Sequence, residues 1–236
     1  MSLSNSVESL ELPKLNRHGS VMRSRIMDVL RNKIIDGSLT PGMHISEEWV
    51  SREMGVSRGP VREALRELEN EALIIFQPYR GATVREITTE ELQDFLLPIR
   101  LVLEKQACLR LLPTITETDF NYLEEIVEKM RIAATVESGE DLHSLVDLDV
   151  SFHEHLINIA DQSYAQQLWR TIQPRIRLAF YRLGPGHQDL QEIAQEHQDL
   201  VDALRTRDPQ IVSTELENHI FTDVIDLIDK VAKKSR

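Results

Sequence analysis

Four residues in the second half of the chain have side chains that together suit a divalent metal ion. Asp149 and His153 are one helical turn apart on an otherwise apolar stripe, and His197 and His219 lie on the apolar faces of two later helical patterns. An ionised aspartate on a buried face is costly unless it is paired or bound to a metal. One carboxylate and three imidazoles suit zinc, with nickel or manganese as alternatives, and leave coordination positions open for water or a ligand. Without a metal, the same residues would be ordinary polar members of a helical core.

A second group of residues suits contact with DNA. Arg58, Arg62 and Arg66 follow one another at intervals of four, which places them on one face of a helix. Gly55 can adopt the left-handed conformation that ends the preceding helix, and Ser57 can cap the helix with the arginines. Guanidinium groups there suit phosphates and guanine edges in a major groove. The pattern therefore predicts a helix-turn-helix. The alternative is a solvated charged face on an ordinary surface helix.

Arg100 and Glu104 form a third candidate site, one helical turn apart just after Pro98. If Arg100 faces the interior of the helical part, its guanidinium can pair with the carboxylate of a small metabolite. Both residues are therefore predicted to contact an effector. Arg175 and Arg177 are weaker candidates for the same role, and for them we favour salt bridges to acidic neighbours.

The elements expected around the arginines are those of a small winged domain. Residues 1–20 are polar and aperiodic, which indicates a flexible arm. A helix is expected over about 21–36, a shorter one after Ser46, and the arginine helix up to Leu68. Two β-prone runs at 73–77 and 82–87 flank a turn and predict a hairpin. Behind a helix-turn-helix that hairpin would be a wing, with Arg80 and Gly81 at its tip near a phosphate or the minor groove.

The rest of the chain shows only helical periodicity. Helices are expected at about 89–112, 117–137, 141–160, 163–183, 188–206 and 209–233, packed as an antiparallel bundle. Pro98 and Pro174 lie inside these patterns and are expected to kink or break them. The fold class is therefore mainly α. The expected domains are a flexible arm over 1–20, a DNA-binding domain over 21–87 and a metal- and ligand-binding domain over 88–236.

The charge of the chain is divided unevenly between these two parts. Residues 1–88 hold 12 Lys and Arg and 12 Asp and Glu, so the overall net charge of −12 lies entirely in residues 89–236. An acidic body repels DNA and leaves DNA contact to the front module. The single cysteine excludes a disulfide framework, and no apolar run is long enough to cross a bilayer. A cytoplasmic location is the default expectation.

Three segments of the front part resemble the winged-helix domain of the GntR family, namely Ile34–Gly42, Gly55–Leu65 and Arg80–Val84. The back part resembles the all-helical FCD effector domain of the FadR-like branch of that family. Its metal-ligand pattern corresponds to Asp149, His153, His197 and His219, and its first-helix signature corresponds to Arg100–Glu104. The resemblance covers nearly all of residues 21–232.

The resemblance implies a homodimeric transcription regulator that binds a palindromic operator. A small organic acid beside the metal would modulate that binding. The predicted DNA-contact residues are Ser57, Arg58, Arg62, Arg66, Arg80 and Gly81. The chain departs from the family pattern at Glu48, where an arginine can occur, at Ala72, where glycine is usual, and at Asp161–Ser163, where a small residue and Asn are usual.

Two other functions fit the same residues. A site of one aspartate and three histidines could activate water in a metalloenzyme, but the sequence offers no separate general base at a recognisable spacing and no hydrolase or nucleotide-binding motif. A regulator without a metal could instead hold a larger ligand, such as an acyl thioester, in the bundle. The expectation is a regulator and not an enzyme.

Overall fold

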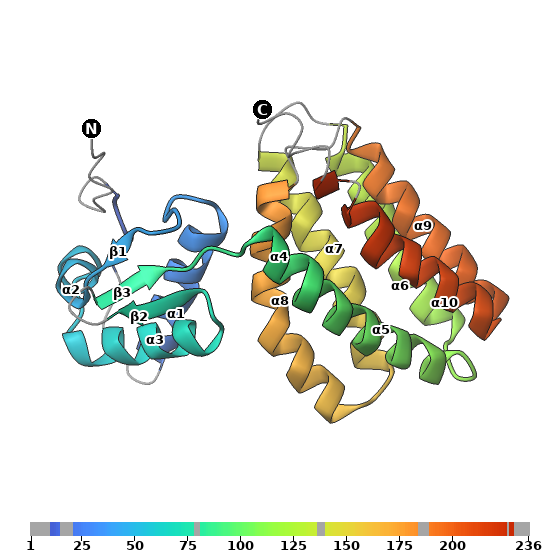
Figure 1. Cartoon of the computed structure of the whole chain (residues 1–236), viewed down its shortest axis with the longest axis horizontal. Coiled ribbons are helices and arrows are strands. Elements are labelled where there is room, and N and C mark those ends of the chain that lie inside the picture. Colours follow the sequence, from blue (N-terminus) through green and yellow to red (C-terminus); the bar gives the residue numbers. More distant parts are fainter. Residues whose placement is uncertain are drawn as a thin grey trace. The chain divides into compact units, whose positions relative to one another are not determined.

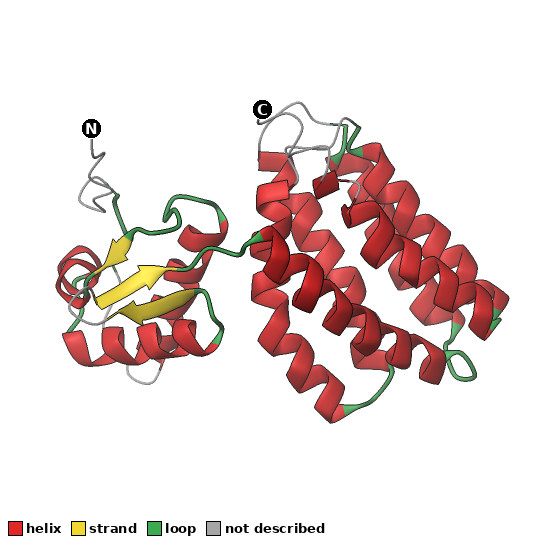
Figure 2. Ribbon diagram, viewed as in Figure 1, coloured by secondary structure: helices red, strands yellow, loops and turns green. Residues whose placement is uncertain are grey.

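The computed structural model of the chain describes residues 10–14, 21–77, 81–135, 140–183, 189–225 and 227–228 (Figure 1). The chain divides into two compact units, Met1–Ile87 and Thr88–Arg236. They are named here the N-terminal unit and the helical unit. The mainly helical architecture predicted from the sequence, with a winged helix-turn-helix followed by a helical bundle, is confirmed (Figure 2).

The N-terminal unit contains three helices and a small sheet. The helices are α1 (Val21–Ile35), α2 (Glu47–Met54) and α3 (Arg58–Asn70), and the strands are β1 (His44–Ile45), β2 (Ile74–Gln77) and β3 (Gly81–Val84). The strands are antiparallel in the order β1-β3-β2. Strands β2 and β3 form the predicted hairpin. The short strand β1 was not predicted, because two residues carry no detectable period.

The turn between α2 and α3 has the geometry expected of a helix-turn-helix. Gly55 ends α2 with a left-handed φ of 68°, and the Ser46 hydroxyl accepts a hydrogen bond from the Trp49 N–H at the start of α2. Ser57 occupies the N-cap position of α3 with extended backbone, but its side chain makes no capping hydrogen bond, in contrast to the expectation. The apolar face of α3, which includes Leu65 and Leu68, is fully buried. Burial of this face therefore fixes which side of α3 points to solvent.

The helical unit contains only helices among its described residues. They are α4 (Thr89–Glu91), η2 (Leu92–Leu96), α5 (Leu97–Leu111), α6 (Glu117–Ala133), α7 (Glu140–Ile159), α8 (Ser163–Leu183), α9 (Gln191–Thr206), α10 (Pro209–Glu217) and η4 (Asn218–Thr222). Helix α6 packs against α7 and α9, and α5 packs against α7 and α10. Segments η2 and η4 are π-helical turns, which run into α5 and follow α10 without a break.

The two prolines do not divide the helices in which they lie. Helix α8 continues through Pro174 from Ser163 to Leu183, so of the kink or break predicted at this position the break does not occur. Pro98 stands in the first turn of α5, directly after the π-helical turn η2. Pro98 has no backbone N–H to donate to the preceding turn. The helix accommodates this by changing from π- to α-helical hydrogen bonding at Leu97, next to the proline.

Candidate metal centre and recognition helix

The four predicted metal ligands meet in the interior of the helical unit. Asp149 and His153 come from α7, His197 from α9 and His219 from η4, and all four are buried. Asp149 Oδ1 lies 3.3 Å from His197 Nε2 and 3.8 Å from His153 Nε2, and His153 Nε2 lies 3.0 Å from His219 Nε2. Two atoms each about 2.1 Å from one metal ion are separated by roughly 3.0–3.4 Å. The cluster therefore has dimensions that suit a single ion.

Contacts outside the cluster orient two of the histidines. His197 Nδ1 lies 2.7 Å from the carbonyl oxygen of Ile193, and His153 Nδ1 lies 2.5 Å from Glu104 Oε2. Both acceptors favour the tautomer in which Nδ1 carries the proton and Nε2 presents its lone pair to the cluster. Metal-binding histidines are held in the same way, by a carbonyl or carboxylate on the outer nitrogen.

Several buried polar atoms at the cluster have no hydrogen-bond partner among the described residues. They include Asp149 Oδ2 and His197 Nε2, and also Nη2 of the neighbouring Arg100. An unsatisfied buried polar group costs about 1–3 kcal/mol. A divalent cation, and a ligand anion beside it, would satisfy such atoms, so the residues present fit a metal.

The protonation states at the cluster also suit a cation. Burial lowers the pKa of the His153 imidazole, and burial together with the neighbouring His197 lowers that of His219 well below its ordinary value. Burial alone would raise the pKa of the Asp149 carboxyl, but the Arg100 guanidinium together with His197 and His153 outweighs burial, and the net shift is downward. At neutral pH the site therefore offers an anionic Asp149 carboxylate beside the neutral imidazoles of His153 and His219, the forms that bind metals.

Arg100 and Glu104, the predicted effector contacts, form a buried ion pair beside the cluster. Arg100 Nε donates to Glu104 Oε1 at 2.6 Å, and the other Glu104 oxygen faces His153. Burial alone would raise the pKa of Glu104, but Arg100 and His153 lower it overall. Glu104 is 0% exposed and does not line the pocket described below, so its position differs from that of an effector contact. The structure places Glu104 behind His153, where it can orient a metal ligand.

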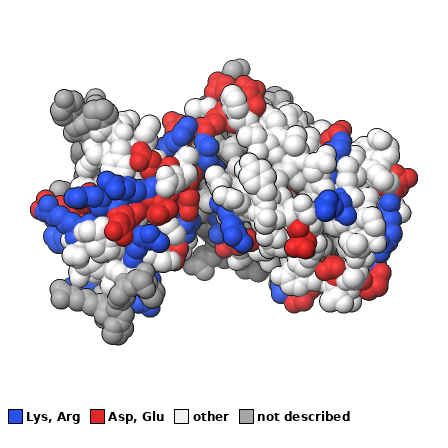
Figure 3. Space-filling view, turned by 90° about the horizontal axis from the view of Figure 1, so that it is seen from below, with Lys and Arg blue, Asp and Glu red and all other residues white. Residues whose placement is uncertain are grey.

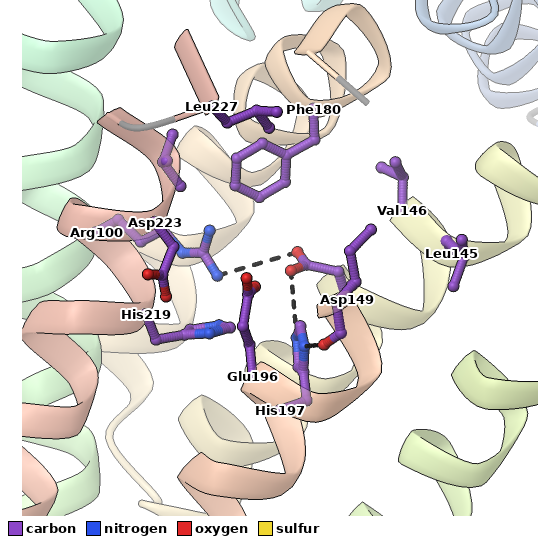
Figure 4. A pocket seen from close by; sticks show the side chains of 12 residues that line it. Arg100, Leu145, Val146, Asp149, Phe180, Glu196, His197, His219, Asp223 and Leu227 are labelled. Atoms are coloured by element: carbon purple, nitrogen blue, oxygen red, sulfur yellow. Dashed lines mark hydrogen bonds and ion pairs between the residues drawn. The ribbon is translucent and has the colours of Figure 1, made fainter. Parts of the chain in front are cut away.

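A pocket of about 60 Å³ opens beside the cluster. Figure 4 shows the Arg100 guanidinium, the Asp149 and Glu196 carboxylates and the His197 imidazole directed toward one another at this pocket. Apolar side chains close the remaining sides. The full lining is Arg100, Leu145, Val146, Asp149, Phe180, Ile193, Glu196, His197, His219, Asp223, Val224 and Leu227.

Glu196 and Asp223 were not found by sequence reasoning. Together with His219 they form a second group of metal-binding side chains whose donor atoms lie within 4.8 Å of one another. The available signals were that Glu196 precedes His197 directly and that Asp223 follows His219 by four residues. Arg175 and Arg177 do not line the pocket. Arg175 pairs with Glu91, and Arg177 Nη1 lies 3.3 Å from Asp147 Oδ1. These are the salt bridges that we expected for the two weaker candidates.

The predicted DNA-contact arginines lie on the solvent face of α3. Arg58, Arg62 and Arg66 are all exposed. Arg62 donates from Nε and Nη2 to the two carboxylate oxygens of Glu47 at 2.7 and 2.8 Å, and Arg58 Nη2 lies 3.3 Å from Glu48 Oε2. Blue and red side chains accordingly lie next to one another on this unit (Figure 3).

At the predicted wing tip, Gly81 begins β3 with a positive φ of 71°. This left-handed backbone favours glycine, and a Cβ at this position would also stand 2.8 Å from His44 Nε2, so the His44 side chain would have to move. Arg80, the other predicted tip residue, lies outside the described residues.

Comparison with known families decides the identity of the chain. Residues 22–84 match the model of the bacterial regulatory proteins of the gntR family, and residues 95–222 match the FCD domain. The chain is a GntR-family regulator with an FCD domain. The predicted DNA-contact arginines Arg58, Arg62 and Arg66 lie in the first match, and all four candidate metal ligands lie in the second.

Relatives of this GntR-family chain are transcription regulators. The gluconate operon transcriptional repressor of Bacillus subtilis is 30% identical over 87% of this chain and 84% of its own length. The HTH-type transcriptional repressor RspR of Escherichia coli is 31% identical over 84% of this chain and 86% of its own. The solved structure of E. coli McbR/YncC shares the fold, with a TM-score of 0.72 and 20% identity over 89% of this chain and 98% of that one. No helix in the described part of this chain is long and apolar enough to span a membrane.

Proposed function

We propose that this chain is a cytoplasmic transcriptional repressor whose helical unit binds a divalent metal ion and a small organic acid that modulates operator binding. The observation that carries the proposal is the convergence of Asp149, His153, His197 and His219 from three segments beside the pocket that Arg100 lines. The names of the curated relatives, which are repressors, support the repressor assignment.

In this proposal Asp149 and the three histidines hold the ion. Zinc is the first candidate, and nickel and manganese are the alternatives. When bound, the metal would supply a Lewis-acidic position for a carboxylate oxygen. Arg100, whose Nη2 is buried without a hydrogen-bond partner, would pair with the same carboxylate. Glu104 would hold both Arg100 and His153 in place from behind.

The remaining polar groups of the pocket favour an acid that also carries hydroxyl groups. Glu196 and Asp223 are carboxylates, which accept hydrogen bonds when ionised and donate none. Hydroxyl groups would donate to them, whereas a second carboxylate on the ligand would not. A hydroxylated monocarboxylic acid therefore suits the pocket, and a relative named for the gluconate operon is consistent with this class.

The alternatives receive less support. A pocket of about 60 Å³ disfavours a ligand as large as an acyl thioester. The named relatives are regulators, so we propose a regulatory and not a catalytic use of the metal centre. Asp149 and the histidines would act by joining α7, α9 and η4, and the ligand would act through different affinities for the DNA-competent and incompetent arrangements.

We also propose a homodimer, which would present two α3 helices to a palindromic operator. Three apolar side chains on η2 and α5 are unusually exposed. Phe95, Ile99 and Val102 are 63, 45 and 65% exposed, and their spacing of four and three residues puts them on one helical face. An apolar stripe of this kind suits burial against a second copy of the chain.

The metal centre is tested by metal content. Protein purified without chelator or a metal-binding tag should contain about one zinc, nickel or manganese ion per chain by mass spectrometry, and the His197→Ala variant should lose it. His44 and His155 are not among the residues of the cluster, so His44→Ala is a matched control that should keep the metal. Absence of metal from the wild-type protein would contradict the proposal.

The DNA contacts are tested by removing the arginines of α3. Arg58→Ala and Arg62→Ala should each weaken operator binding by about tenfold or more, since a bidentate contact to guanine contributes about 1–3 kcal/mol. Fluorescence anisotropy with a labelled operator measures the effect. Arg52→Ala, on α2, is the control. Unchanged operator affinity in both α3 variants would refute the assignment of this face to DNA.

A further inference from the structure

Two carboxylates at the start of α2 contact the recognition helix. Glu47 and Glu48 are consecutive, and each faces a different arginine of α3. Glu47 accepts two hydrogen bonds from Arg62 at 2.7 and 2.8 Å, while Glu48 makes a single contact of 3.3 Å with Arg58. Both arginines are predicted DNA contacts, so the acidic groups lie where DNA would bind.

The two pairs differ in geometry and exposure. The Glu47 side chain is 27% exposed and engages Arg62 through two parallel hydrogen bonds, which fix the plane of the guanidinium. The Glu48 side chain is 71% exposed, and its one contact with Arg58 constrains that guanidinium little. The first pair is therefore suited to orienting an arginine, and the second to competing for one.

We propose that these carboxylates set the DNA specificity of α3, Glu47 by holding Arg62 in one orientation and Glu48 by competing with phosphates for Arg58. The inference rests on the proposed DNA-binding function. Recognition of a guanine edge requires a correctly oriented guanidinium, so the Glu47 contact favours the operator. On non-specific DNA Arg58 has only phosphates to bind, so a carboxylate that competes for Arg58 disfavours this binding fully, whereas on the operator Arg58 can also contact a guanine edge. The specific base contacts of the operator would then outweigh a penalty that non-specific DNA cannot overcome.

The test compares three single substitutions in the full-length protein. An operator is first selected from random duplex DNA with the wild-type protein. Affinities for this operator and for a scrambled duplex of equal length are then measured over a series of salt concentrations. The variants are Glu48→Gln, Glu47→Gln and the control Glu53→Gln. Glu53 is also on α2, but it pairs with Arg52 at 3.1 Å and not with α3.

Glu48→Gln should bind scrambled DNA more tightly. An exposed ion pair changes an equilibrium constant by at most about fivefold, so the increase should reach at most about 25-fold for two copies. The slope of log affinity against log salt concentration should become steeper by the amount expected for about two additional phosphate contacts per dimer. The operator should gain less than the scrambled DNA, so the ratio of the two affinities falls.

Glu47→Gln should weaken operator binding by about tenfold without weakening the binding of scrambled DNA, because only the operator uses the oriented Arg62 contact. If Glu47 only stabilised the fold, Glu47→Gln would lower the affinities for the operator and for scrambled DNA together and would leave the salt dependence of binding unchanged. The inference is overturned if Glu48→Gln and Glu47→Gln both behave like Glu53→Gln. If the wild-type protein selects no sequence at all, the proposed function itself fails, which is a separate result.

Discussion

At the scale of single residues, the buried pair of Arg100 and Glu104 connects the pocket with the candidate metal centre. Arg100 is 1% exposed and reaches toward Asp149, with 4.0 Å between Nη2 and Oδ2, while Glu104 contacts His153. One fully buried carboxylate thus serves an arginine and a histidine together. Such outer contacts orient metal ligands, and their loss typically reduces metal affinity 10–100-fold.

Glu104→Gln should therefore lower the metal affinity by about 10–100-fold while the protein still folds, because the amide keeps the shape of the side chain. Competition with a coloured chelator measures the affinity. Glu125→Gln is a suitable control, since Glu125 pairs only with the exposed Lys129 on α6. Metal affinity equal to that of the wild-type protein would show that Glu104 does not orient His153.

At the scale of elements, the connection between α3 and β2 contains backbone strain. Ala72 has a φ of 53°, in the left-handed region that favours glycine. The same position is a usual glycine in the family that the chain resembles. A residue with a side chain in the left-handed region destabilises the fold by about 1–2 kcal/mol. Glycine avoids this strain, but it destabilises the fold by up to about 1 kcal/mol because it increases the conformational entropy of the unfolded chain.

Ala72→Gly should thus raise the free energy of unfolding by up to about 1 kcal/mol, measured by urea titration. Ala134→Gly provides the matched control, because Ala134 ends α6 with a right-handed φ of −69°. That control should lose stability. A loss of the same size in both variants would mean that Ala72 carries no strain.

The stability of the packing between α7, α9 and η4 should depend on pH when the protein contains no metal. Burial lowers the pKa of His153 and His219 in the folded chain, so the unfolded chain binds more protons below its ordinary histidine pKa of about 6.5. The free energy of unfolding of chelator-treated protein should therefore fall by up to about 2 kcal/mol between pH 6.5 and 5.5. Urea titrations at both pH values measure this. His219→Asn should show a smaller fall, and a pH-independent wild-type value would contradict the argument.

At the scale of the whole molecule, the exposed stripe of Phe95, Ile99 and Val102 should hold two copies together. Val102→Glu would place a charge on that stripe and should convert a dimer into a monomer in sedimentation equilibrium. Operator binding should weaken with it, because a monomer contacts one half-site. Ile132→Glu is the control, since Ile132 is 59% exposed on α6. A Val102→Glu variant that remains dimeric would place the dimer contact elsewhere.

The sequence by itself determined the helices, the turn at Gly55, the family and the four candidate metal ligands. These features rest on local signals, namely helical periodicity, caps and the type of residue on each helical face. The same signals were insufficient for β1, whose two residues are ordered only by pairing with β3. They also left open whether Pro174 kinks or breaks its helix, and the structure shows that α8 continues through the proline.

Only the tertiary structure decided which of these groups touch. His153 meets His219 across 66 residues, and Arg62 meets Glu47 across 15. The position of Glu104 behind His153 and the presence of Glu196 and Asp223 at the pocket likewise depend on how α5, α7, α9 and η4 pack. Periodicity assigns a side chain to a face of its own helix, but the partner on that face comes from the packing of distant segments.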